Sequence, residues 1–271
     1  MQELLEMFSY SFVKDALVCG IAVSLSAALI GIILVLKKYS MIGHGLGEVA
    51  FASISLAVAF GISPLYISVP LVIIASFIIM MISQKRGEEG DIAIALVSSG
   101  ALTFGVIITA ITKGFNIDVY NYMFGSILAV TKQDVLLSVI LSIAIIVIYI
   151  VFYNRIFMVT YDEKYAKSKG INTTFYQFLI SLITALIVVV GMKIMGTLLI
   201  SSLIVFPALI SKKLTKSFKG MVIMSGFISI ICFIIGLTFS FILNLPTGAS
   251  IVTVYIILLF VSNISMKFLK Y

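Results

Sequence analysis

Two residues in the stretch YSMIGHGLGEVAF, from Tyr39 to Phe51, are of types that bind metal ions. His44 is the only histidine among 271 residues, and Glu48 follows it by four positions. On a helix this spacing places both side chains on one face, with Cβ atoms about 5–6 Å apart. Imidazole and carboxylate are ligands that divalent first-row metals such as zinc, manganese and iron accept. The pair is therefore a candidate metal-ligand pair.

The same two residues also allow a structural interpretation. Glu48 could pair with His44, or hydrogen-bond a neighbouring helix, and so hold helices together inside a membrane. Two residues cannot fill a four-coordinate site, so a metal site needs further ligands from elsewhere. Three glycines flank the pair and permit close approach of another helix. They are Gly43, Gly45 and Gly47.

The composition indicates the elements that must position this pair. Hydrophobic residues make up 62% of the chain and charged residues 11%, with a mean hydropathy of +1.25, whereas soluble domains carry about a quarter charged residues. The sequence predicts an all-α, polytopic helical membrane protein that forms one domain over residues 1–271. Apolar runs long enough to span a bilayer cover residues 16–36, 42–61, 64–83, 92–112, 135–153, 176–193, 195–211, 221–243 and 249–266. The two runs around Gly191 and Gly196 are short, so the prediction is eight or nine transmembrane helices.

Charge distribution predicts the orientation. With nine spans, most of the 18 basic residues fall in loops on one side of the membrane, which makes that side cytoplasmic and places the N-terminus outside. The net charge of +7 is then a topology signal, and nucleic acid is not expected as a partner. Residues 1–14 carry Glu3 and Glu6 rather than a basic signal-peptide start, and their apolar spacing allows an amphipathic interfacial helix.

Two loops are candidates for partner contacts. In the cytoplasmic segment 154–174, Tyr161, Tyr165 and Lys169 recur every four residues and Gly170 is placed as a helix stop. This pattern fits either a solvated surface turn or a helix presented to a cytoplasmic partner. In the outer segment 113–134, Tyr122 and Phe124 suit an interfacial aromatic belt, and together with Asp118 they are also a candidate docking surface or gate.

Several kinds of enzyme are excluded by missing motifs. A single histidine cannot form HExxH, no G-x-S-x-G accompanies it, and no GxxxxGK[ST] phosphate loop occurs. Cys19 and Cys232 both lie within apolar runs, so we expect them to be core residues rather than a disulfide or zinc cluster. We therefore expect no catalysis by this chain itself and no permanently bound cofactor.

Five ordered segments resemble conserved blocks of the ABC-3 family of metal-importer permeases. They are LVLKKYSMIGHGLGEVAFASISLAVAFG, YNYMFGSILAVTKQDV, TYDEKYAKSKGI, MKIMGTLLISSLIVFPALIS and LPTGASIV. The first resembles the family segment in which a basic pair precedes an aspartate and a histidine spaced i, i+4. Here His44 comes first and Glu48 second, so the order of imidazole and carboxylate is reversed. Both ligand types are retained, which favours the metal interpretation.

The resemblance implies a homodimeric, multi-pass permease in the bacterial cytoplasmic membrane. It implies two cytoplasmic ABC ATPase subunits and an extracytoplasmic metal-binding protein as partners, besides membrane lipid. It also implies that the segment around Asp162 to Gly170 is the coupling helix that docks into the ATPase. The residues expected to make this contact are Tyr161, Asp162, Glu163, Tyr165, Ala166 and Gly170.

The predicted function is that of the transmembrane permease subunit of an ATP-driven importer of divalent transition metals. Zinc is favoured, manganese or iron are alternatives, and the metal ion is the transported substrate rather than a cofactor. His44 and Glu48 are the predicted transient ligands. The alternative is a secondary, ion-coupled metal transporter that works without an ATPase, although a proton relay would need more intramembrane carboxylates than Glu48.

Overall fold

The computed structural model describes residues 10–86, 90–112, 123, 125 and 131–269. Within them every regular element is a helix, which confirms the all-α prediction. The long helices are α2 (Ser11–Leu36), α3 (Met41–Ala59), α4 (Pro64–Arg86), α5 (Gly90–Ile111), α7 (Lys132–Val151), α10 (Thr173–Met195), α11 (Thr197–Leu214), α12 (Phe218–Leu243) and α13 (Thr247–Leu269). Two short helices, α8 (Tyr153–Tyr161) and α9 (Glu163–Ser168), lie between α7 and α10.

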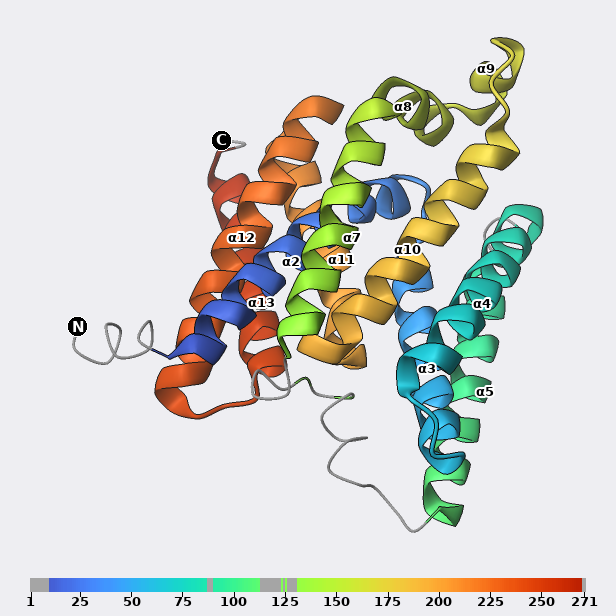
Figure 1. The fold of residues 1–271 in the computed structure, drawn as a ribbon. Coiled ribbons are helices and arrows are strands. Elements are labelled where there is room, and N and C mark those ends of the chain that lie inside the picture. Colours follow the sequence, from blue (N-terminus) through green and yellow to red (C-terminus); the bar gives the residue numbers. More distant parts are fainter. Residues whose placement is uncertain (1–9, 87–89, 113–122, 124, 126–130, 270–271) are drawn as a thin grey trace.

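The long helices run alternately up and down, so the basic segment containing α8 and α9 lies at the same end of the bundle as the last turn of α13, and the beginning of α2 lies nearer the other end (Figure 1). Among the described residues, eight helices are long and apolar enough to cross a membrane by length and composition, and α11 is not one of the eight. The prediction of a polytopic membrane protein is confirmed. Helix α2 begins at Ser11, so residues 11–14 belong to the first long helix, while residues 1–9 lie outside the described part.

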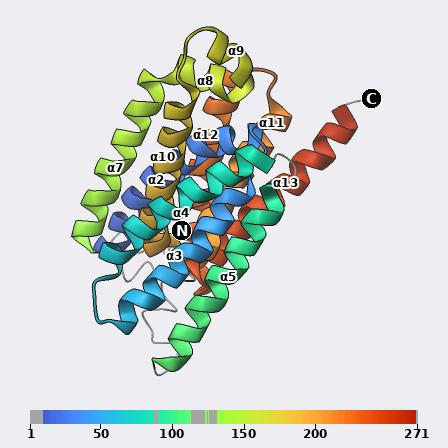
Figure 2. The same ribbon diagram turned by 90° about the vertical axis from the view of Figure 1, so that its right-hand side faces the viewer.

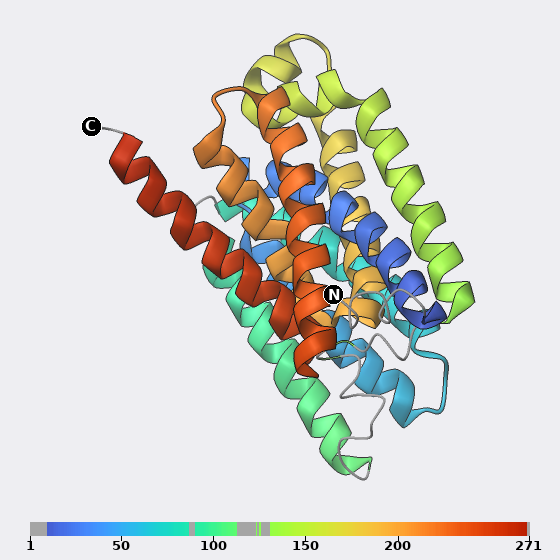
Figure 3. The same cartoon turned by 90° about the vertical axis from the view of Figure 1, so that its left-hand side faces the viewer.

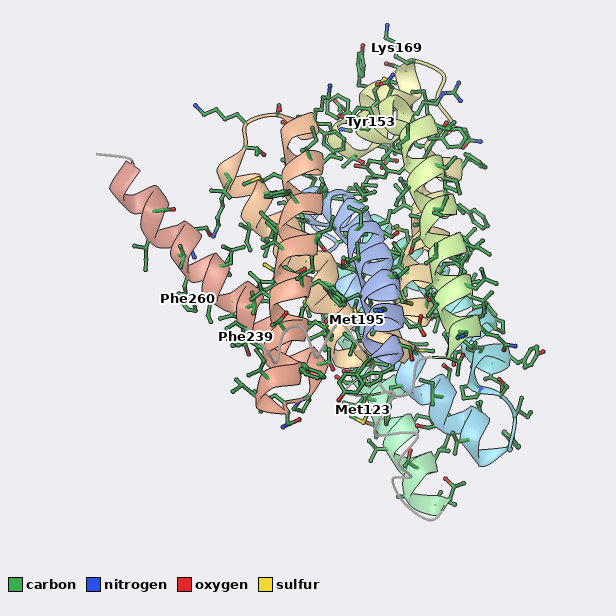
Figure 4. All side chains as sticks on the ribbon, turned by 60° about the vertical axis from the view of Figure 1, so that its left-hand side comes forward. Met123, Tyr153, Lys169, Met195, Phe239 and Phe260 are labelled. Atoms are coloured by element: carbon green, nitrogen blue, oxygen red, sulfur yellow. The ribbon has the colours of Figure 1, made fainter. Side chains whose placement is uncertain are left out.

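Helices α2, α3 and α10 are largely buried in the bundle, whereas α4, α5, α7 and α13 expose most of their surface. Figure 2 shows α3 beside α4 and α5, and both neighbours contact it. Figure 3 shows α13 along the outside of the bundle, packed on α12. Phe239 on α12 and Phe260 on α13 point away from the bundle (Figure 4) and are 50% and 63% exposed. Such apolar outer faces suit contact with lipid.

The α10–α11 boundary depends on one glycine. Gly196 separates the two helices and has φ +86° and ψ 153°, a backbone region that essentially only glycine occupies. The short apolar runs on either side of this residue are thus two separate helices. Cys19 and Cys232 are free and buried, as predicted from their position in apolar runs.

Serine side chains link several helices inside the bundle. The Ser76 hydroxyl of α4 donates to the Ser181 carbonyl of α10 at 2.7 Å, and the Ser229 hydroxyl of α12 donates to the Ser24 carbonyl of α2 at 2.8 Å. In lipid, such hydrogen bonds add to van der Waals packing as a source of helix association. They join α4 to α10 and α12 to α2.

Candidate functional site

Helix α3 carries the predicted ligand pair close to its beginning. It starts at Met41, so His44 and Glu48 lie on successive turns and face the same side. The His44 Nε2 and Glu48 Oε1 atoms are 3.8 Å apart, which is too long for a hydrogen bond. Two ligand atoms held tetrahedrally about 2.1 Å from one ion are about 3.4 Å apart, and the observed separation of 3.8 Å is close to this distance.

The two side chains differ in exposure. The Glu48 side chain is 10% exposed and the His44 side chain is 47% exposed, although most of α3 around them is buried. The carboxylate is therefore largely buried, whereas the imidazole is partly exposed at the surface of this single chain.

The flanking glycines show which neighbours surround the pair. A Cβ on Gly47 would lie 2.9 Å from the Thr197 carbonyl oxygen of α11, and one on Gly43 would lie 3.3 Å from Ile204 Cδ1 of the same helix. A Cβ on Gly45 would lie 2.9 Å from Ile94 Cγ2 of α5. At about 100° per residue, the His44–Glu48 face therefore points between α11 and α5. The glycines permit the close helix approach predicted from the sequence.

The described part of one chain does not complete a metal site around this pair. Within the part of the chain that the structure describes, no group of three or more His, Cys, Asp or Glu side chains could hold a metal ion. Additional ligands for a four-coordinate ion would have to come from water, from a second copy of the chain or from residues outside the described part. The exposed imidazole lies on the side from which such ligands can approach.

The predicted coupling segment forms two short helices that meet at Asp162. This residue caps α9, because its carboxylate accepts a hydrogen bond from the Tyr165 backbone N–H at 2.9 Å. Gly170 has φ +76°, and the Gly170 and Ile171 N–H groups donate to the Lys167 and Ala166 carbonyls. These two bonds form the Schellman motif that ends many helices at glycine, so the predicted helix stop is confirmed.

The six residues predicted for partner contact have different positions. Tyr161 and Tyr165 are 73% and 51% exposed, and they are available to another protein. Ala166 is buried, so it anchors α9 to the bundle instead of lying on the contact surface. Figure 4 shows Lys169, just beyond α9, at the tip of this end of the molecule. Its ammonium lies over the Tyr165 ring, 5.7 Å from the centroid.

Glu163 faces the bundle and makes contacts that the sequence analysis missed. Its carboxylate accepts a hydrogen bond from Gln177 Nε2 of α10 at 2.8 Å and lies 3.8 Å from Lys37 Nζ. Lys167 Nζ, one turn along α9, is 2.9 Å from the same carboxylate. Lys37 was considered only as part of the topology signal, and Gln177 as part of an apolar run. A glutamine inside a spanning helix was the one sequence signal that could have identified this contact.

The outer candidates Asp118, Tyr122 and Phe124 lie outside the described residues. Their suggested role as a docking surface or gate stays a prediction.

A family model described as ABC 3 transport family matches residues 9–266. The chain belongs to the ABC 3 transport family. This match confirms the resemblance inferred from the five ordered segments, and it spans all the long helices nearly to the end of α13. Together with the eight apolar helices, membership of this transport family establishes a multi-pass protein of the cell membrane.

Two similar proteins are named as manganese transport components. The chain is 27% identical over 256 residues to a manganese transport system membrane protein, MntC, of Listeria monocytogenes, which covers 94% of this chain and 91% of that protein. It is 26% identical over 262 residues to a manganese import system permease protein, ScaB, of Streptococcus gordonii, covering 96% and 94%. A solved structure described as PsaBC from Streptococcus pneumoniae in complex with Fab matches with a TM-score of 0.85 and 25% identity over 96% of this chain and 94% of that one.

Proposed function

We propose that the chain is the membrane permease subunit of an ATP-binding-cassette importer for divalent transition-metal ions. The observation that carries the proposal is the pair of metal-ligand types on one face of α3, with Nε2 and Oε1 3.8 Å apart and the imidazole partly exposed. An ionisable residue inside a membrane-spanning segment is costly and usually serves function. The family match gives this pair a transport context.

In the proposed mechanism the ion passes between two copies of the chain. Each copy contributes His44 and Glu48, so two opposed pairs supply four ligands, of which one chain holds only two. The ligands bind the ion weakly enough to release it, because transport requires that the ion can both enter and leave the site. The close packing of α3 on α11 at Gly47 fixes the backbone that carries the carboxylate.

We propose manganese as the principal cargo. The sequence favoured zinc, but both similar proteins reported above are named as manganese transport or import proteins. One imidazole and one carboxylate from each copy form a mixed nitrogen and oxygen ligand set without thiolate, which is compatible with manganese and iron as well as zinc. Zinc and iron are therefore the competitors to test.

ATP hydrolysis is assigned to a separate cytoplasmic subunit that docks on α8 and α9. The exposed Tyr161 and Tyr165 give this surface two large aromatic contacts, a residue type enriched at protein interfaces. The opposite side receives metal from an extracytoplasmic binding protein. Membership of a family of ABC transport proteins weighs against the alternative of an ion-coupled secondary transporter.

The test is manganese uptake into proteoliposomes that contain the chain, its ATPase subunit and its binding protein. We expect ATP-dependent manganese uptake, and zinc and iron are added separately in excess to measure how strongly each competes. His44→Ala and Glu48→Gln should each reduce uptake about tenfold or more, the effect expected from removing a ligand-shell group. Phe60→Leu, at the exposed far end of α3, is the matched control and should leave uptake unchanged.

Two results would overturn the proposal. Uptake by liposomes that hold the chain alone, driven by a proton gradient, would support the secondary transporter. Unchanged uptake by the double variant His44→Ala, Glu48→Ala, in a complex that still assembles, would show that the pair is a structural contact.

A further inference from the structure

Lys37 is a buried lysine at the turn that precedes the metal-ligand helix. It is the C-terminal cap of α2, and its side chain is only 7% exposed. Lys38, the next residue, is exposed. A buried ammonium is costly unless a charged or hydrogen-bonding partner compensates for the lost water. The compensating group here is the Glu163 carboxylate on α9, 3.8 Å away.

The electrostatics of this turn reflect the same contact. Burial lowers the pKa of Lys37, and the Glu163 carboxylate partly opposes that shift, while Lys167 adds to it. Burial raises the pKa of Tyr39, and the negative charge of Glu163 raises it further. The Glu163 carboxylate is thus close enough to act electrostatically on two residues of the turn between α2 and α3.

The turn itself is short and closely hydrogen-bonded. The Tyr39 N–H donates to the Leu34 carbonyl at 2.7 Å, and the Ile42 N–H donates to the Tyr39 carbonyl at 3.0 Å. Helix α3 begins at Met41, so His44 lies within two helical turns of Lys37. Figure 1 shows this turn beneath α8 and α9, inside the same end of the bundle. A displacement of Lys37 would therefore be passed to the start of α3 rather than absorbed by a flexible loop.

We propose that Glu163 and Lys37 are positioning residues that connect the short helix α9 to the ligand pair on α3. When the ATPase subunit shifts α9, the ion pair draws the α2–α3 turn with it and alters the separation of the His44 and Glu48 pairs of the two copies. This inference rests on the proposed function, because it assigns α9 as the ATPase contact. It adds a specific ionic route between that contact and the metal path.

The geometry distinguishes this pair from the other ion pair of Glu163. Lys167 is on α9 itself and its side chain is 62% exposed, so its contact with Glu163 remains within one helix. Gln177 joins Glu163 to α10, and a glutamine at position 163 could keep that hydrogen bond through its amide oxygen. Glu163→Gln therefore removes the attraction to Lys37 while preserving the shape and the contact with α10.

The experiment compares variants of the complete complex in proteoliposomes and measures the manganese transported per ATP hydrolysed. Lys37→Met is the principal variant, because it keeps the buried apolar stem and leaves the Glu163 carboxylate 35% exposed and still paired with Lys167. We expect this ratio to fall about fivefold or more in Lys37→Met and in Glu163→Gln, a typical size for coupling between sites. We expect the double variant to be no worse than either single variant, because both remove one interaction.

Two matched controls decide whether the effect is specific. Lys38→Met changes the adjacent exposed lysine, and Lys167→Gln removes the other ion pair of the same carboxylate; both should keep the wild-type ratio. An unchanged ratio in Lys37→Met, or an equal loss in either control, would overturn the ionic route. If Glu163→Gln does not assemble, Lys37→Met alone decides. Absence of ATP-driven uptake in the wild-type complex would instead overturn the proposed function.

Discussion

Replacement of Gly47 by alanine tests the packing that positions the ligand pair. The added Cβ would lie 2.9 Å from the Thr197 carbonyl oxygen. Because this oxygen belongs to the backbone, the contact can be relieved only if α11 as a whole shifts. Overpacking of this kind costs about 1–3 kcal/mol. Alanine in place of glycine returns about 1 kcal/mol through helix propensity. The expected net effect is a loss of up to about 2 kcal/mol, together with a shift of Glu48, the next residue.

Gly226→Ala on α12 is the matched control. Its Cβ would also lie 2.9 Å from a neighbour, but that neighbour is the flexible Leu25 Cδ1. Rotating this side chain costs about 0.5–1.5 kcal/mol, which the gain in helix propensity offsets. The measurements are the apparent melting temperature in detergent and manganese uptake in liposomes. We expect both to fall in Gly47→Ala relative to Gly226→Ala, and a difference of about 2 kcal/mol corresponds to roughly 4–8 °C. Equal values for the two variants would refute the close approach of α3 and α11.

Three further changes test the segments around the site. Gly170→Ala should reduce the free energy of unfolding by about 1–2 kcal/mol, because alanine is unfavourable at a left-handed position. It should also weaken binding of the ATPase subunit in a pull-down more than Gly170→Asn does. Equal binding by the two variants would contradict the role of this helix end. Gly196→Ala should lower the melting temperature, since φ of +86° and ψ of 153° cost any residue other than glycine about 1–3 kcal/mol of strain. An unchanged melting temperature would show that the backbone between α10 and α11 does not have this conformation. Burial lowers the folded-state pKa of Lys37 below the usual 10.5, so between these two pKa values the unfolded chain binds more protons than the folded chain, and stability rises with pH up to about 10.5. The melting temperature of the wild type should therefore rise relative to that of Lys37→Met between pH 8 and 10. Parallel melting-temperature curves for the two proteins would refute the buried charge.

The helices were largely predictable because each long apolar run must form its own backbone hydrogen bonds in a membrane. Helix α3 covers Met41–Ala59, close to the predicted run 42–61. Gly196 separates two helices whose apolar runs were too short to fix the number of spans. The predicted start of the first helix was less accurate, because Ser11 to Asp15 continue the helix but are too polar to count as part of an apolar run.

The relation between α9 and α3 was not predictable. Glu163 and Lys37 are far apart in sequence, and each has a sufficient local explanation, Lys37 in the positive-inside pattern and Glu163 in a solvated helix. Only the three-dimensional packing of α9 above the α2–α3 turn brings them within 3.8 Å. In the same way, Ala166 belongs to a recognisable segment, but its burial depends on the helices beneath it.

The most direct test of the proposed metal site uses the fact that His44 is the only histidine in the chain. Pulsed electron paramagnetic resonance of manganese bound to the purified chain in lipid nanodiscs, without partner proteins, detects coupling to an imidazole nitrogen. We predict that this coupling is present in the wild type, remains in Phe60→Leu and disappears in His44→Ala. Manganese bound to the wild type without nitrogen coupling, or with a coupling that persists in His44→Ala, would contradict the assignment of His44 as a ligand of the transported ion.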